Sequence, residues 1–114
     1  MADCLFCKMI KGEIKAKVAY EDPDIYAIHD INPQAPVHLL IIPKKHIERL
    51  CDVRADDFGV LTNLIATANQ LAKTNEIDQR GYRLVINCNP EAGQTVYHIH
   101  VHLLGGRPMK WPPG

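Results

Sequence analysis

The chain lacks a long apolar run, since no stretch approaches the ~18 residues that a membrane span requires. It also lacks an excess of either charge. Thirteen Lys and Arg balance thirteen Asp and Glu, which argues against a basic surface for nucleic-acid polymers. No basic segment followed by an apolar one stands at the N-terminus, so we expect no secretory signal peptide. These absences predict a cytoplasmic protein whose four cysteines are free thiols unless a metal binds them.

What the chain does contain is typical of one globular domain. Its 114 residues are 46% hydrophobic and 23% charged, and they include no internal repeat and no low-complexity segment. We therefore expect a single domain over 1–114. The balanced net charge does not exclude small anions as ligands, because a turn of backbone N–H groups binds phosphate without net charge.

Apolar periodicity predicts two helices and five strands. Between Phe58 and Ala72, apolar residues recur every three or four positions, which indicates one long helix with Asp56 or Asp57 as its N-cap. The other segments alternate or are uniformly apolar, as strands are. The expected elements are a short helix over 5–11, strands over 17–20, 25–29 and 38–42, the long helix over 56–75, and strands over 82–88 and 96–104.

The order of these elements predicts how they assemble. Consecutive strands joined by short turns pair antiparallel. The fold class is therefore α+β: a five-stranded antiparallel sheet with the long helix packed on one face, plus a short N-terminal helix. Because a core of this size often gains from association, we also expect a homodimer.

Three histidines alternate near the end of the chain, at His98, His100 and His102. In a strand, alternate side chains share one face, so the imidazoles are expected in a row with Ile99 and Val101 on the core side. Neutral imidazole is a good nucleophile toward phosphorus and imidazolium is a good acid, and both forms are accessible near neutral pH.

The neighbours of this row favour an anion site. Gly93, Gln94 and Thr95 form a turn just before it, and such a turn can offer backbone N–H groups and a hydroxyl to phosphate. His38 begins another predicted strand. Two alternatives stay open: a merely polar, solvated strand face, and a metal site, for which no third carboxylate ligand stands nearby in the sequence.

The segment 93–106 resembles the histidine-triad (HIT) signature, His-φ-His-φ-His-φ-φ, and similarity extends through 29–36, 38–46 and the ending 111–114. The two glycines after the triad and the Trp-Pro-Pro-Gly ending are most similar to the HINT-type nucleoside phosphoramidases. This resemblance implies a homodimeric hydrolase that cleaves the phosphorus–nitrogen bond of purine nucleoside 5′-monophosphate conjugates. It also implies that the tail over 105–114 reaches toward the partner subunit's site.

The resemblance assigns roles to the histidines. It implies that His100 attacks the phosphorus to form a nucleotidyl-imidazole intermediate, which water then cleaves. His102 and Thr95 match positions that contact the phosphate and the leaving group, and His98 and His38 match positions that complete the cluster and orient the nucleophile. Threonine stands at 95 where close relatives often have serine; it keeps the hydroxyl on a stiffer side chain.

A nucleotide pocket is implied in the same way. Asp30 matches the carboxylate that accepts the ribose hydroxyls, and Trp111 lies in the tail that influences substrate choice. Taken alone, the apolar members of the set are ordinary core residues, Asp30 is a turn residue and the tail is a loosely attached end. The implied substrate-binding residues are Phe6, Met9, Ile28, His29, Asp30, Ile31, Leu40, Asn87, Gly93, Gln94, Thr95 and Trp111.

Cys4 and Cys7 have the spacing of a zinc knuckle, which needs two further ligands. The resemblance supplies them, because some bacterial triad proteins bind zinc through this pair and two histidines that match His46 and His98. We therefore expect a structural zinc and no cofactor required for catalysis. Two reduced cysteines in a short helix remain the alternative, since the sequence shows no thioredoxin-type context for a redox motif.

Three functions compete at this point. The first is the phosphoramidase with a covalent histidine intermediate. The second is a purine-nucleotide-binding regulatory protein with little turnover. The third is a metallohydrolase that uses the triad as metal ligands.

Overall fold

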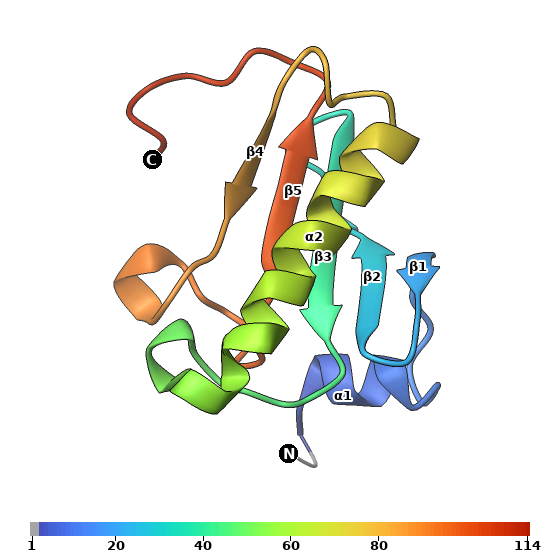
Figure 1. Ribbon diagram of the computed structural model, residues 1–114, viewed down its shortest axis with the longest axis vertical. Helices are drawn as coiled ribbons and strands as arrows, with labels where there is room; N and C mark the ends of the chain where they lie inside the picture. Colours follow the sequence, from blue (N-terminus) through green and yellow to red (C-terminus); the bar gives the residue numbers. More distant parts are fainter. Residues whose placement is uncertain (1–2) are drawn as a thin grey trace.

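The computed structural model describes residues 3–114, and its centre is a five-stranded antiparallel sheet in the order β1-β2-β3-β5-β4 (Figure 1). Short loops join β1, β2 and β3 in succession, whereas β4 and β5 follow the long helix and close the sheet on the other side of β3. The strands are β1 (Val18–Glu21), β2 (Ile25–His29), β3 (Val37–Pro43), β4 (Tyr82–Val85) and β5 (Val101–Gly105). This is the predicted fold class.

Helix α2 (Phe58–Thr74) lies across one face of the sheet (Figure 1). The alternation of β2, β3 and β5 places one set of side chains, which includes Ile41 and Val101, under Leu64 and Ala68 of the helix. Asp57 occupies the N-cap position as expected, but its carboxylate accepts from the Arg54 N–H and pairs with Lys45 instead of capping α2. The main core is therefore the interface between α2 and the sheet.

The opposite face of the sheet carries a second, smaller apolar cluster. Phe6 of α1 (Leu5–Ile10) packs there against Tyr26, Ile28, Leu40 and Ile42, the alternate residues of β2 and β3. Because His102 alternates with the core residues of β5, it belongs to this second face. The candidate site is therefore built on the face that α2 leaves free.

The last predicted strand is shorter than expected. It begins at Val101 instead of 96, and the fourth strand ends at Val85 instead of 88. The pairing of β3 with β5 stops at Ile41 and Val101, and the Ile99 N–H then donates to the Ile47 carbonyl at 2.7 Å. His98 and His100 consequently precede the strand, and the three imidazoles do not form one row.

Two further features frame the site. At Gly105 the side chain of Ile77 approaches so closely that an added Cβ would stand 2.5 Å from Ile77 Cδ1, so any larger residue there would require Ile77 to shift. The chain then leaves the sheet past the β4 edge and ends in an extended tail (Figure 1). Within residues 3–114, no helix combines the length and the apolar character that crossing a bilayer demands.

Candidate active site and metal centre

A pocket of about 310 Å³ lies on the face of the sheet opposite α2. Residues of α1, β2 and β3 form its apolar walls, and His100 and His102 also line it. Its lining consists of Leu5, Phe6, Met9, Ile28, His29, Asp30, Ile31, Leu40, Asn87, Gly93, Thr95, Val96, His100 and His102.

His100 is held in a single tautomer. Its Nδ1 lies 2.8 Å from the His98 carbonyl oxygen, which can only accept, so Nδ1 carries the proton and Nε2 keeps its lone pair. The ring is buried, and burial lowers the pKa of His100 below its usual range, against the opposing effect of the His98 carbonyl. Phe6 meets the ring edge-on at 5.0 Å between centroids. The result is a fixed, neutral imidazole with its free nitrogen available to the pocket.

His38 and His102 form a second fixed pair. The Gln34 N–H donates to His38 Nδ1 at 3.0 Å, so the His38 proton is on Nε2. That nitrogen lies 2.9 Å from His102 Nδ1 and 3.3 Å from Asp30 Oδ2. Because His102 Nδ1 accepts this proton, His102 carries its own proton on Nε2. His102 therefore offers an N–H on Nε2, whereas His100 offers a lone pair on its own Nε2.

Burial controls the charge of this pair. It is the largest cause that lowers the pKa of His102 to about 4, and the neighbouring His100 and His38 lower it further. Burial also lowers the pKa of His38, although the Asp30 carboxylate acts in the opposite direction. Both rings are therefore neutral at pH 7, and the negative charge of a bound phosphate would favour their protonation.

The turn before the histidines is arranged differently from the expected cradle of amides. The Gly93 N–H donates to the Pro90 carbonyl at 3.0 Å and the Gln94 N–H to the Asn89 carbonyl at 3.2 Å, so neither is free for an anion. Gly93 has a φ of 94°, which reverses the chain and brings Thr95 to the pocket. Thr95 and Asn87 are therefore the polar side chains that this part of the wall offers.

Gln94 lies outside the pocket, and its role is to fix the loop. Its side chain is buried, accepts from the Asn89 N–H at 2.9 Å and donates to the Glu48 carbonyl at 2.8 Å and the Val96 carbonyl at 3.2 Å. These bonds join the loop that carries Thr95 to the segment after β3. Gln94 therefore positions the wall of the pocket through the backbone.

A second cluster stands beside the pocket and contains Cys4, Cys7, His46 and His98. His46 Nδ1 lies 3.1 Å from His98 Nδ1, and the Cys7 sulfur lies 3.4 Å and 3.6 Å from the two nitrogens. The Cys4 sulfur is 3.4 Å from His98 Nδ1. All four donor atoms thus converge on one point, and Phe6 meets both the His98 ring and the His100 ring edge-on.

Comparison with known proteins decides the family, because the HIT domain model matches residues 11–109. The chain belongs to the HIT family. It is 57% identical to a HIT family hydrolase from Legionella pneumophila, with a TM-score of 0.97 over 98% of this chain and 100% of that one. A HIT family hydrolase from Clostridium thermocellum is 46% identical, with a TM-score of 0.93 over 96% of each chain. A 14 kDa zinc-binding protein from Brassica juncea is 46% identical over 98% of this chain and 100% of its own length.

The Cys/His cluster of this HIT protein fits zinc. Tetrahedral zinc, at ~2.3 Å from sulfur and ~2.0 Å from nitrogen, places its ligand atoms roughly 3.3–3.7 Å apart, close to the separations described above. The His98 Nε2 lies 2.7 Å from the Pro43 carbonyl, so its proton is on Nε2 and Nδ1 is free to ligate. The set offers four protein ligands, which leaves no open position for a substrate. Zinc held by these residues would tie α1 to the segments around His46 and His98.

A second metal-like group, Asp30, His38 and His102, does not fit an ion equally well. Sequence reasoning found no carboxylate near the triad, and the fold brings one from the end of β2. The His38 Nε2, however, carries the proton that its Gln34 contact requires, so it presents N–H rather than a lone pair. The group is better described as a hydrogen-bonded relay than as a metal site.

The pocket gathers most of the residues that the sequence singled out. All the implied substrate-binding residues line it except Gln94 and Trp111, and Trp111 is 83% exposed in the tail. Ile31 borders the pocket although it is fully exposed. His38 does not line the pocket and instead contacts His102. Leu5 and Val96 also line the pocket, and no signal in the sequence distinguished them from other apolar residues.

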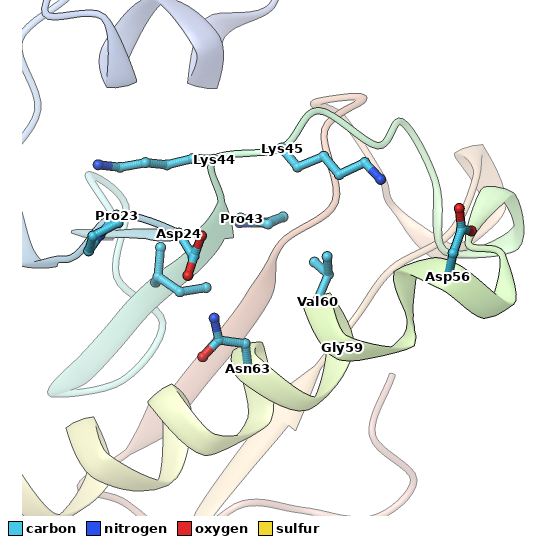
Figure 2. Close-up of a pocket in the computed structure, with 10 residues that line it drawn as sticks. Pro23, Asp24, Pro43, Lys44, Lys45, Asp56, Gly59, Val60 and Asn63 are labelled. Carbon is cyan, nitrogen blue, oxygen red and sulfur yellow. The ribbon is translucent and has the colours of Figure 1, made fainter.

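A larger cavity, of about 430 Å³, lies between the β1–β2 turn, the end of β3 and the start of α2 (Figure 2). Lys44 and Lys45 extend from it in opposite directions, and they pair with Glu21 and Asp57 respectively. Its lining contains no imidazole and no thiol. Size alone therefore does not identify the site, and the chemistry is concentrated in the smaller histidine-lined pocket.

Proposed function

We propose that this protein hydrolyses the phosphorus–nitrogen bond of purine nucleoside 5′-monophosphate conjugates through a covalent nucleotidyl-His100 intermediate. The observation that carries the proposal is the pair of complementary tautomers in one pocket. His100 presents a lone pair on Nε2, while His102 presents a proton on Nε2. A nucleophile and an acid side by side are what displacement at phosphorus requires.

The rest of the pocket suits a nucleotide. Phe6, Ile28 and Leu40 supply apolar walls for a base. Asp30 Oδ1 accepts from the Asn32 N–H at 2.8 Å, which fixes the carboxylate at the mouth, where it can accept ribose hydroxyls. Thr95 and Asn87 stand on the side where the phosphate would lie. The base, sugar and phosphate therefore each have a matching chemical partner.

In the proposed reaction His100 Nε2 forms a bond to the α-phosphorus as the bond to the departing nitrogen breaks. His102, which the bound phosphate keeps protonated, gives its Nε2 proton to that nitrogen and becomes a neutral imidazole, assisted by the Thr95 hydroxyl. His102 then accepts a proton from water, which attacks the nucleotidyl-imidazole and releases the nucleoside monophosphate. The Asp30 carboxylate, 3.3 Å from His38 Nε2, raises the pKa of His102 and so favours the protonated ring that acts as the acid.

The proposal includes a homodimer. Phe58 and Ile65 are exposed apolar residues on α2, and Trp111 is exposed in the tail beyond the β4 edge. A second copy that covers these residues would also let each tail approach the other subunit's pocket. Light scattering of the purified protein is expected to give the mass of a dimer, and a monomer at micromolar concentration would contradict this part.

The test is a pair of assays on wild-type protein and His100→Ala with an adenosine 5′-phosphoramidate. We expect the variant to lose more than ~100-fold in kcat/KM, since each tenfold corresponds to ~1.4 kcal/mol of transition-state stabilisation. Acid-quenched intact-mass analysis of the wild type is expected to show one nucleotidyl adduct, and peptide mapping should place it on His100.

Binding of the nucleoside monophosphate is the control, and it should change little in His100→Ala. Retention of most activity by that variant would rule out covalent catalysis by His100. Tight binding by the wild type without product in a single turnover would instead favour the regulatory nucleotide-binding protein.

A further inference from the structure

The two cysteines outside the Cys/His cluster lie next to each other. Cys51 is in the exposed turn η1 (Leu50–Asp52) and Cys88 follows β4, 37 positions later in the chain. The Cys88 side chain is close enough to the Cys51 thiol to raise its pKa. Neither cysteine lines the pocket or belongs to the metal cluster.

Independent contacts hold these two segments together. Arg49 donates through Nε and Nη2 to the Asp52 carboxylate, at 2.9 Å and 2.8 Å, and through Nη1 to Asn89 Oδ1 at 3.3 Å. Asp52 and Asn89 are the sequence neighbours of the two cysteines, so one guanidinium joins the two segments through the side chains next to Cys51 and Cys88. Gln94 adds a second connection between the same segments through its bond to the Glu48 carbonyl.

We propose that Cys51 and Cys88 are an oxidisable pair that closes an intramolecular disulfide between η1 and the loop after β4. Hydrogen peroxide is the oxidant. The Cys51 sulfur bonds to one peroxide oxygen as the O–O bond breaks and water leaves, which gives a sulfenic acid. The Cys88 sulfur then displaces the hydroxyl as a second water, so that two thiols and one peroxide give one disulfide and two waters.

The setting of the pair matches this chemistry. Cys51 is exposed and can meet the oxidant, while Cys88 is partly covered and can resolve the sulfenic acid. The Arg49 guanidinium lies near Cys51 and favours its thiolate form. Against this, the contact with Cys88 and then burial raise the pKa of the Cys51 thiol, so oxidation is expected to be faster above neutral pH.

The disulfide would act on the pocket. Cys88 stands between Asn87, which lines the pocket, and Asn89, which has a φ of 75° and anchors Gln94. Closing the bond brings the two sulfurs to ~2.05 Å and so draws this loop toward η1. A shift of ~1 Å in a catalytic wall can cost up to ~100-fold in rate. This consequence, unlike the disulfide itself, rests on the proposed function.

The experiment uses zinc-loaded wild-type protein treated with hydrogen peroxide and then alkylated and digested with trypsin without reduction. Trypsin places Cys4 and Cys7 together in residues 1–8, Cys51 in 50–54 and Cys88 in 84–110. We expect a linked 50–54/84–110 peptide and a loss of two hydrogens from the intact protein, both reversed by a thiol reductant. Recovery of Cys51 and Cys88 as separate alkylated peptides, or oxidation confined to 1–8, overturns the proposal.

The Cys51→Ser variant is the matched control, and zinc content is measured in every sample. Peroxide should lower kcat/KM of the wild type by about ten- to a hundredfold, reversibly, and change the variant less than twofold. Equal losses in both proteins, or a linked peptide with unchanged turnover, contradict the effect on the pocket. If reduced protein shows no phosphoramidase activity, the proposed function fails, while the peptide map still decides whether the disulfide forms.

Discussion

The protein has two groups of histidines, one in the metal cluster and one in the pocket, and residues 98–102 contribute to both. The two groups differ in which imidazole nitrogen carries the proton. In the metal cluster, His46 and His98 direct Nδ1 to a common point with two sulfurs. In the pocket, His100 has its proton on Nδ1 and offers Nε2. The difference arises from two backbone carbonyls. The Pro43 carbonyl accepts a hydrogen bond from His98 Nε2–H, and the His98 carbonyl accepts one from His100 Nδ1–H. A histidine's role is thus decided by the acceptor on its other nitrogen.

Loss of the metal cluster is expected to have the largest effect on stability. Cys7→Ala removes one zinc ligand, and we expect zinc content to fall and the free energy of unfolding to drop by more than ~3 kcal/mol, because metal binding contributes directly to folding. Well below the melting temperature, turnover should fall less than ~tenfold, since no step passes through the metal. Metal analysis, denaturant unfolding and kinetics measure these three quantities.

Cys51→Ala is the control for that prediction, because Cys51 is exposed and outside the cluster. A strong chelator should act like Cys7→Ala on stability. If chelation abolished the activity of protein that is still folded, and a divalent metal restored it, the metal would take part in catalysis. That result would contradict the separation of a structural metal cluster from a catalytic pocket.

Substitution of His102 is expected to have an intermediate effect that depends on the leaving group. His102→Asn removes the Nε2 proton donor, so kcat for an alkylamine conjugate should fall by ~100-fold or more. A conjugate whose nitrogen departs readily without a proton, such as an imidazolide, should lose far less. Steady-state kinetics on the two substrates measure the difference, and equal losses would contradict the acid role.

The smallest expected effect is in the pH dependence of stability. The folded state lowers the pKa of His102 to about 4, while the unfolded chain titrates near the ordinary value of ~6.5. The unfolded state therefore binds more protons between these values, and the stability present above pH ~6.5 declines as the pH falls toward 4. His102→Asn should reduce this slope by less than ~1.4 kcal/mol per pH unit, because solvent partly screens the ring. Denaturant unfolding between pH 4.5 and 7 tests this, and identical slopes would contradict it.

The regular part of the fold could be predicted because its periodicity is local. Ile25 to Ile28, Leu39 to Ile42 and Val101 to Leu104 alternate between the two faces, and α2 repeats every three or four residues, as the sequence indicates. The prediction was wrong between 96 and 100. There the alternation of apolar residues and histidines continues, but Ile99 bonds to Ile47 rather than to a strand. Alternation therefore indicates which side chains share a side without showing that the sheet continues.

The sequence identified many of the residues that line the pocket, but not the contacts among them. The relay of Asp30, His38 and His102 joins residues up to 72 positions apart, and no local pattern shows such pairings. Gln94 stands in the expected phosphate turn, yet its amide side chain finds three backbone partners and turns inward. Tautomers depend on carbonyls such as those of Pro43 and His98, and their positions follow only from the folded backbone.

His98 joins the two groups, with its ring at the metal position and its carbonyl on the ring of His100. A cobalt(II) ion in place of zinc would therefore be bound by the residue whose carbonyl accepts a hydrogen bond from the His100 ring. Its unpaired electrons would shift the magnetic resonance signals of the His100 ring, so that nucleotide binding and intermediate formation could be followed spectroscopically in the unmutated protein.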